Sequence, residues 1–203
     1  MSHSFFDLTF TPSVKKQQEH YGTRQNYVRF ESGEPDFLGL TDDETEFIAE
    51  RDSFYLASVG ENGQPYVQFR GGPPGFLKVL DSKTLAYADF RGNLQYISVG
   101  NLTANDRAAL ILMDYANRQR LKILARIEIK DAAEVPELIT QLQIPNYKAK
   151  VERAAILHVD AFDWNCPRHI TPRFTAEQVS VLNQPLYDRI AKLEEQIERL
   201  KSI

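Results

Sequence analysis

Residues 63–93, GQPYVQFRGGPPGFLKVLDSKTLAYADFRGN, decide the fold of this chain. Runs rich in aromatic and β-branched residues alternate there with turn residues, a pattern typical of short antiparallel strands. The run 71–75 holds three glycines and two prolines in five positions, so no helix or regular strand passes through it. The segment predicts strands interrupted by a bend beside Arg70 and Lys78. It is either a ligand cradle or a surface loop that only connects strands.

The same pattern continues on both sides of this segment. A capping box at Thr41–Glu44 begins a short helix whose Phe47 and Ile48 are expected to face inward, and further short helices are predicted over 12–22 and 132–142. Strands are predicted at 53–59, 65–70, 76–80, 84–90, 108–113, 120–129 and 154–162. Six or seven short strands with few helices between them favour a mainly β fold, a small closed or half-open antiparallel barrel.

The C-terminal segment differs in kind from the strands. Its apolar residues are spaced four, three, four and three, the pattern of a short coiled coil or of a docked helix: Leu186, Ile190, Leu193, Ile197 and Leu200. We expect this helix to pack on its own domain or on a second subunit. The predicted organisation is an N-terminal helical extension packed on the barrel over 1–51, a barrel over 52–174 and an amphipathic helix over 175–203.

Composition narrows the classes of function. The chain has 203 residues and a formal net charge of -4, which argues against bulk affinity for nucleic acid, because such affinity depends on a basic surface. No apolar stretch approaches the length of a membrane span, and the N-terminus lacks the pattern of a signal peptide. The single cysteine, Cys166, fits a reducing compartment. We therefore expect a cytoplasmic protein without a membrane or nucleic-acid partner.

Familiar catalytic motifs are absent from the sequence. There is no phosphate loop, no GxGxxG, no CxxC and no HExxH, and the four histidines have no metal-ligand spacing, so no metal site is predicted. What remains is a set of basic and amide residues on successive strands, which can hold a phosphate and frame a planar ring. This set comprises Gln68, Arg70, Lys78, the run 89–95 and the run 118–122.

On these residues the chain resembles a known family. The runs GQPYVQFR, FLKVLDSKTLAYADFRGNLQ and NDRAALILMDYANRQRLKILA, within residues 52–129, are similar to the FMN-binding split barrel of pyridoxamine 5'-phosphate oxidase and its relatives. The resemblance implies a homodimer that binds FMN without a covalent bond between two subunits. It implies cofactor contacts from Gln68, Phe69, Arg70, Gly71, Lys78, Ala88, Asp89, Asn93, Gln95, Arg118 and Arg120, and from Trp164 and Arg173 of a partner subunit.

Two departures from the family pattern affect the expected site. Leu94 and Gln95 stand where the family has two basic residues, so other cations must meet the phosphate charge. His169 and Thr171 stand near the positions of an arginine and a histidine that hold the substrate of the vitamin B6 oxidase, which argues against that reaction. The resemblance is therefore to an uncharacterised branch, and His169 and Arg173 are candidates for positioning a substrate over the flavin ring.

Three functions follow as alternatives. The first is an FMN-dependent oxidoreductase that acts on an unidentified small molecule, with NADH or NADPH as a candidate electron donor. The second is a flavin-binding or storage module without catalysis. The third is a haem-binding relative of the split barrel, for which His158 and His169 are the candidate axial ligands. Fold resemblance alone does not choose among them.

Overall fold

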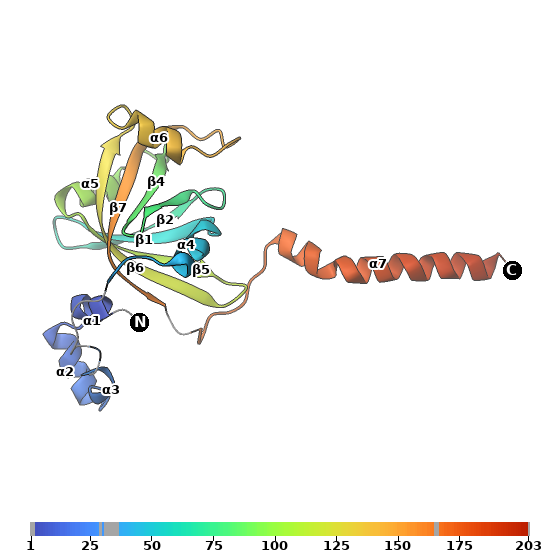
Figure 1. Ribbon diagram of the computed structural model, residues 1–203, viewed down its shortest axis with the longest axis horizontal. Coiled ribbons are helices and arrows are strands. Elements are labelled where there is room, and N and C mark those ends of the chain that lie inside the picture. Colours follow the sequence, from blue (N-terminus) through green and yellow to red (C-terminus); the bar gives the residue numbers. More distant parts are fainter. Residues whose placement is uncertain (1–2, 29, 31–36, 165–166, 203) are drawn as a thin grey trace.

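The computed structural model describes residues 3–28, 30, 37–164 and 167–202. Its strands form one seven-stranded antiparallel sheet in the order β2-β1-β5-β6-β7-β4-β3, curled into a split barrel (Figure 1). The strands are β1 (Ser53–Val59), β2 (Pro65–Gly71), β3 (Leu77–Asp81), β4 (Thr84–Phe90), β5 (Arg107–Asp114), β6 (Gln119–Asp131) and β7 (Val151–Trp164). The helices are α1 (His3–Thr9), α2 (Pro12–His20), α3 (Gln25–Val28), α4 (Asp42–Ala49), α5 (Ile97–Ala104), α6 (Pro136–Leu142) and α7 (Ala176–Lys201). The mainly β split barrel expected from the sequence is confirmed.

The main core fills the inside of the curled sheet. It joins residues of six strands, all but β2, with α4, whose Phe47 and Ile48 are buried as predicted. Phe54 of β1 stacks on Phe76 with ring centroids 5.6 Å apart, so the segment that follows the glycine-proline run is anchored in the main core. Apolar burial of this kind supplies most of the stability of such a domain.

Strand β4 is buried on both faces because two cores meet on it. Leu85 and Tyr87 face the main core, while Ala86 and Ala88 belong to a second cluster with Ile139 of α6. Its run TLAYADF therefore reads as nearly continuous apolar sequence rather than as an alternating strand. β6 and β7 are long strands whose pairing shifts register at a bulge between Leu124 and Ala125, which bends the sheet.

The glycine-proline run is the predicted break in the sheet. β2 ends at Gly71 and β3 begins at Leu77, and the amide of Gly72 donates to the carbonyl of Asp52 at 2.9 Å. A Cβ at Gly72 would lie 2.8 Å from Cβ of Phe76, closer than real contacts allow. Glycine at this position therefore permits Phe76 to enter the core.

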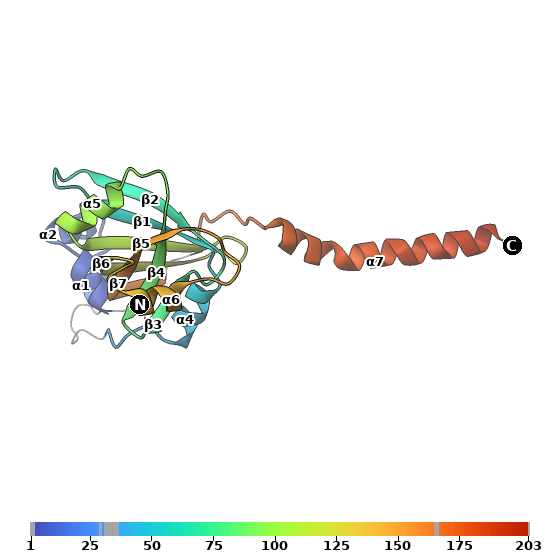
Figure 2. The same cartoon turned by 90° about the horizontal axis from the view of Figure 1, so that it is seen from above.

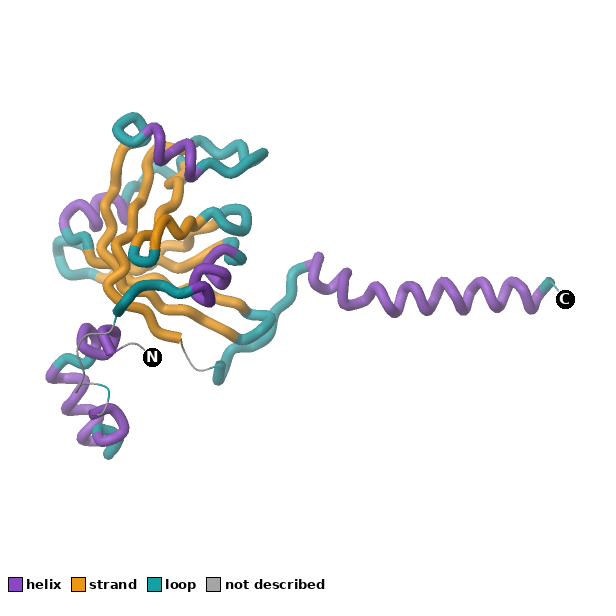
Figure 3. Tube along the Cα trace, in the orientation of Figure 1, coloured by secondary structure: helices purple, strands orange, loops and turns teal. Residues whose placement is uncertain are grey.

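The helices lie at the periphery of the barrel. The aromatic rings of Phe5 and Phe6 on α1 pack against Ala161 of β7, whereas α2 and α3 contribute no buried residue. Figure 3 shows α1, α2 and α3 together on one side of the strands. Helix α5 is not among the helices predicted from the sequence. The division of the chain into an N-terminal extension over 1–51, a barrel over 52–174 and a C-terminal helix over 175–203 stays a prediction.

Helix α7 projects away from the barrel, as two perpendicular views show (Figures 1 and 2). None of its 26 residues is buried. The sequence predicted that this helix packs either on its own domain or on a second subunit. The structure shows no packing of α7 on its own domain. None of the described helices has the length and apolar content needed to cross a membrane.

Candidate functional site

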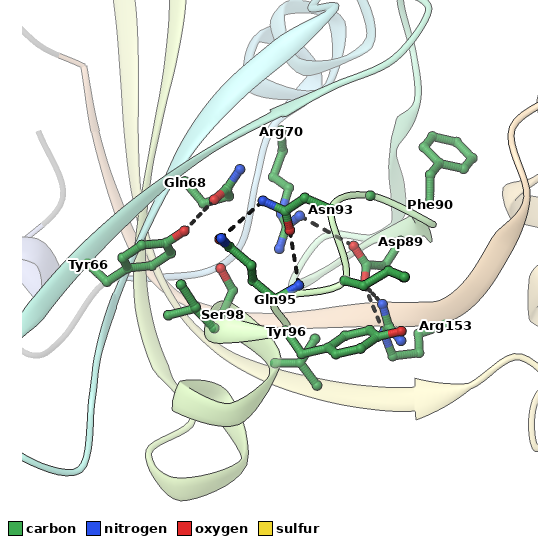
Figure 4. A pocket seen from close by; sticks show the side chains of 14 residues that line it. Tyr66, Gln68, Arg70, Asp89, Phe90, Asn93, Gln95, Tyr96, Ser98 and Arg153 are labelled. Carbon is green, nitrogen blue, oxygen red and sulfur yellow. Dashed lines mark hydrogen bonds and ion pairs between the residues drawn. The ribbon is translucent and has the colours of Figure 1, made fainter.

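A cavity of about 170 Å³ opens beside the ends of β2 and β4 (Figure 4). Even-numbered residues of β2 enter it, since successive side chains of a strand point to opposite faces. Its walls also include the loop that follows β4, the first turn of α5 and one residue of β7. The lining residues are Tyr66, Gln68, Arg70, Asp89, Phe90, Gly92, Asn93, Leu94, Gln95, Tyr96, Ile97, Ser98, Val99 and Arg153.

Two arginines share one buried carboxylate in this cavity. Arg153 donates to Asp89 Oδ2 from Nε at 2.9 Å and lies 2.8 Å from it through Nη2, while Arg70 Nη1 lies 3.5 Å from Asp89 Oδ1. Asp89 and Arg153 are direct partners in the pairing of β4 with β7. Arg153 also lies 3.2 Å from a second carboxylate, that of Glu152, which Arg91 contacts at 3.6 Å. The three arginines and two carboxylates together carry one more positive than negative charge, which suits an anionic ligand.

Arg70 keeps an unused donor. Its Nε is buried and has no hydrogen-bond partner among the described residues. A buried donor without a partner costs free energy, so the arrangement favours an acceptor from outside the chain. Burial raises the pKa of the neighbouring Tyr87 to about 12, against the opposing effect of the Arg70 charge. Tyr87 is therefore neutral and does not supply that acceptor as an anion.

The first turn of α5 adds main-chain donors to the cavity. The N-cap residue Tyr96 has φ 52, and within the described chain no side chain caps this helix. The first helical bond runs from Gly100 N to Tyr96 O, so the amides of Ile97, Ser98 and Val99 have no partner within the helix. Open amides and the helix dipole together attract anions.

Hydrogen bonds shape the loop before α5. Asn93 Oδ1 accepts from the amide of Gln95 at 3.1 Å, and Asn93 Nδ2 donates to Gln95 Oε1 at 3.2 Å. Across the cavity Tyr66 donates to Gln68 Oε1 at 2.5 Å. Leu94 has φ 63, a left-handed conformation that is uncommon for leucine. These contacts fix amide groups at the cavity rim, where they can hydrogen-bond to a polar ligand.

The structure brings five of the predicted cofactor residues to this cavity: Gln68, Arg70, Asp89, Asn93 and Gln95. Lys78 and Ala88 lie elsewhere. Lys78 pairs with Ala86, on the face of β4 that packs toward α6, and Ala88 is buried in that same cluster. Neither residue lines the cavity in the described structure.

A second group of predicted residues lies on the outer face of the sheet. Phe69 packs edge-on against Tyr55 with ring centroids 5.7 Å apart, and both rings are exposed. Arg120 occupies the same face by strand register, and its Nε is also buried without a partner in the described chain. Gly71 ends β2 on this face, and Arg118 lies exposed in the turn between β5 and β6 with φ 56.

Arg173 extends this outer-face group from the C-terminal segment. Its guanidinium carbon lies 4.8 Å from the centroid of the Tyr115 ring. Burial, together with a hydrogen bond to Tyr55, raises the pKa of Tyr115. His169, by contrast, is exposed with φ 65 and lies outside the cavity lining.

Trp164 has a structural partner in its own chain. Its indole N–H donates to Glu44 Oε1 at 2.5 Å, and its ring packs edge-on against Phe47 with centroids 4.8 Å apart. The hollow beside it is lined by Asp43, Glu46 and Glu50, which would repel a phosphate. This placement does not favour the flavin contact that the resemblance implies for Trp164.

Sequence reasoning missed several residues of the cavity, of which Arg153 is the most important. The expected last strand began at residue 154, so Arg153 fell just outside it. Its pairing with Asp89 across β4 and β7 joins residues that lie 64 positions apart. Only the strand register reveals this pair. Tyr96 and Ser98 were missed because α5 was not predicted as a helix.

Comparison with known proteins identifies the family. The family described as Pyridoxamine 5'-phosphate oxidase matches residues 40–171. The chain belongs to the pyridoxamine 5'-phosphate oxidase family. This membership and the observed architecture establish a split barrel of the flavin-binding type. No curated protein matches this chain.

Solved structures show likenesses at low identity. HupZ of Group A Streptococcus is 16% identical with a TM-score of 0.48, over 66% of this chain and 99% of that one. A putative pyridoxamine 5'-phosphate oxidase from Lactobacillus delbrueckii is 18% identical with a TM-score of 0.49, over 62% and 93%. General Stress Protein 26 from Bacillus anthracis is 12% identical with a TM-score of 0.42, over 66% and 95%. At these scores the likenesses carry no argument about ligand or activity.

Proposed function

We propose that this member of the pyridoxamine 5'-phosphate oxidase family binds FMN and acts as an FMN-dependent oxidoreductase on a small molecule. The observation that carries the proposal is the cavity in which Arg70 and Arg153 share Asp89 beside the open first turn of α5. This donor set fits a phosphate monoester. Arg70 would donate its unused Nε, and the amides of α5 would complete the contacts.

In this proposal another cation compensates for the two basic residues that the family has at positions 94 and 95. Arg153 enters the cavity from β7 and replaces a charge that the loop no longer provides. Its guanidinium carbon lies 5.0 Å from the centroid of the Tyr96 ring, which helps to hold the side chain over the cavity. Gln68, Asn93 and Gln95 would then orient polar groups of the ligand.

The size of the cavity supports a site shared by two copies of the chain. About 170 Å³ is smaller than the roughly 300–1,000 Å³ of typical small-molecule pockets. One chain would hold the phosphate end, and the ring would lie against a second copy. The outer face of β1 and β2 supports this arrangement, because Tyr55, Val67 and Phe69 form an exposed apolar surface on a sheet face.

The residues of the outer face would supply the second half of each site. Arg120 and Arg173 bring positive charge, and Phe69 and Tyr55 bring aromatic surface. When bound, FMN supplies hydride or electron transfer. The protein would bind the phosphate, orient the ring, exclude water and place a cation near the ring edge that becomes anionic on reduction.

Two alternatives remain open, and one spectrum separates them from each other. A storage module would bind FMN in the same cavity without turnover. Haem binding would need an axial ligand, but among the described residues that line the cavity there is no histidine, while His158 is exposed on β7. The observation therefore favours flavin over haem.

The experiment is to purify the full chain and record its absorption spectrum. Flavin bands in the blue and near ultraviolet support the proposal, a strong Soret band supports haem, and a colourless protein that gains no flavin on incubation with FMN overturns it. Anaerobic addition of NADH and then NADPH tests the redox activity. Bleaching of the flavin supports an oxidoreductase, whereas failure with both leaves the storage module as the better account.

A further inference from the structure

Helix α7 carries an apolar stripe that nothing in the described chain covers. Five residues of the stripe, Leu186, Ile190, Leu193, Ile197 and Leu200, are between 40% and 72% exposed. A single helix in water gains little stability from propensity alone and depends on packing of its apolar face. The stripe therefore calls for a partner outside the barrel.

The spacing of the stripe fits heptads over a longer stretch than the five residues alone. When Leu186, Leu193 and Leu200 occupy the d position, Ile190 and Ile197 occupy the a position. The same register extends upstream, with Val179 at d and Asn183 at a. Isoleucine at a with leucine at d favours two parallel strands, and one asparagine at a specifies register and the two-stranded state.

The charges of α7 favour a protein partner over a lipid surface. Membrane-surface helices are rich in lysine and arginine on their polar face. The polar face of α7 is mixed instead, with acidic Glu177, Asp188, Glu194, Glu195 and Glu198 and basic Arg189, Lys192, Arg199 and Lys201. Such mixed charge is typical of the solvent-facing and flanking positions of coiled coils.

The distribution of ion pairs along α7 points to a second copy of the same helix. Glu195 pairs with Arg199, and Glu198 pairs with Lys201, within the helix. Arg189 and Glu194 have no ion pair or hydrogen bond in the described structure. These two residues occupy a g position and the following e position, which meet between the strands of a parallel pair. A parallel, in-register dimer would therefore form the Arg189–Glu194 contact twice.

Pro185 is compatible with this register. It occupies a c position, on the side of the helix away from the stripe, and it removes one main-chain donor. A proline there bends the helix without placing its ring in the seam. The helix continues without another proline from Leu186 to Lys201, which contains all five of the exposed stripe residues.

We propose that α7 pairs with α7 of a second copy in a parallel, in-register, two-stranded coiled coil. Parallel pairing places both barrels at the same end of the coil. Antiparallel pairing would separate them by the length of a 26-residue helix, about 39 Å. Tethering at one end raises the effective concentration of one barrel around the other. The coil itself does not depend on the ligand that the barrel binds.

Cysteine cross-linking of the full chain tests orientation and register. In a Cys166→Ser background, Leu186→Cys and Leu200→Cys each place a thiol in the seam, while Asp188→Cys places one on the outer side as a control. Under mild oxidation, we expect each seam variant alone to form a covalent dimer and the control to stay largely monomeric. Cross-linking only when the two seam variants are mixed would mean antiparallel pairing and would overturn the proposal. Equal cross-linking of seam and control variants, or none at all, would overturn it too.

A second measurement excludes local damage by the cysteines. Ile190→Asp combined with Ile197→Asp should remove much of the helical circular dichroism of α7. Val181→Asp combined with Lys192→Asp, at outer positions that form no ion pair in the described structure, should retain it. Unchanged helicity in the isoleucine variant would contradict the coil. The colour of the protein keeps this proposal separate from the proposed function. A cross-linked but colourless protein retains the coil and loses the flavin, and a yellow protein without cross-links does the reverse.

Discussion

Arg70 is the side chain on which the proposed phosphate site depends most. It is partly covered, shares Asp89 with Arg153 and has a buried Nε without a partner in the described chain. We expect Arg70→Ala to weaken FMN binding by about ten- to a hundredfold, since a hydrogen bond to a charged group contributes roughly 1.5–3 kcal/mol. Lys78→Ala should change it little, because Lys78 lies outside the cavity lining. Titration of the apoprotein with FMN, followed by flavin fluorescence, measures both; a larger loss in the Lys78 variant would reject the assignment.

Adding a single Cβ atom at Gly72 tests the packing of the glycine-proline run. A Cβ there would lie 2.8 Å from Cβ and Cγ of Phe76. We expect Gly72→Ala to lower the free energy of unfolding by about 1–3 kcal/mol, as overpacking does. Gly100→Ala is the matched control, because a Cβ at Gly100 meets nothing within 4 Å and alanine favours the helix. Urea unfolding of both variants decides the matter, and equal stabilities would show that the loop relaxes around the new methyl group.

Single residues differ in how far the sequence predicts them. Gln68 and Arg70 follow from their strand, because alternation places both on one face. The contact of Asp89 with Arg153 depends on the register of β4 and β7, which no local pattern contains. For Trp164 the resemblance implies a ligand contact from a partner subunit, which stays a prediction, while within its own chain its N–H donates to Glu44. Side chains that meet because they alternate along one strand were predictable from the sequence, whereas a contact that depends on the register between two strands was not.

Among the elements, α4 depends on a buried carboxylate. Glu44 accepts from the amide of Thr41 at 2.9 Å and from the indole of Trp164. Burial raises the pKa of this carboxyl, but the hydrogen bonds from Thr41 and Trp164 outweigh burial, so the pKa lies below 4.5. We expect Glu44→Ala to cost about 2 kcal/mol of stability at neutral pH through loss of the cap and of the buried bond. Glu46→Ala, on the exposed side of α4, should cost little.

The pH dependence of this difference has a definite sign. A carboxyl whose folded pKa is lowered contributes stability that is fully present above its unfolded pKa and is lost as the pH falls through the folded pKa. The gap between wild type and Glu44→Ala should therefore be full above pH 4.5 and shrink below it. Thermal unfolding between pH 3 and pH 7 measures the gap; a gap that widens in acid would contradict the account.

Elements were predictable where their pattern is local. The strands at 53–59 and 84–90 match β1 and β4, and the glycine-proline run breaks the sheet as expected. Helix α5 was not predicted, because its sequence ISVGNLTA has no clear amphipathic pattern and contains a glycine. The first turn of α5 lines the cavity, so a helix that the sequence did not predict contributes main-chain donors to the proposed site.

At the scale of the whole molecule, large apolar side chains are exposed on β1 and β2 and along α7. We expect Val67→Glu on β2 to weaken FMN binding at least tenfold, although Val67 does not line the cavity, because the charge would disrupt contact with a second barrel. Val181→Glu is the matched control, since Val181 is 74% exposed on α7 away from the stripe. FMN titration with sedimentation of the same samples checks this; wild-type affinity in Val67→Glu would contradict the shared site.

The most direct measurement of the central claim compares FMN with riboflavin, which lacks the phosphate, in binding to the full wild-type chain. If Arg70, Arg153 and the first turn of α5 hold a phosphate, FMN should bind at least tenfold more tightly than riboflavin. Arg70→Gln should remove most of that preference, and Arg126→Gln, an exposed arginine of β6 that pairs with Asp160, should keep it. Equal affinity of the wild-type protein for FMN and riboflavin would contradict the claim.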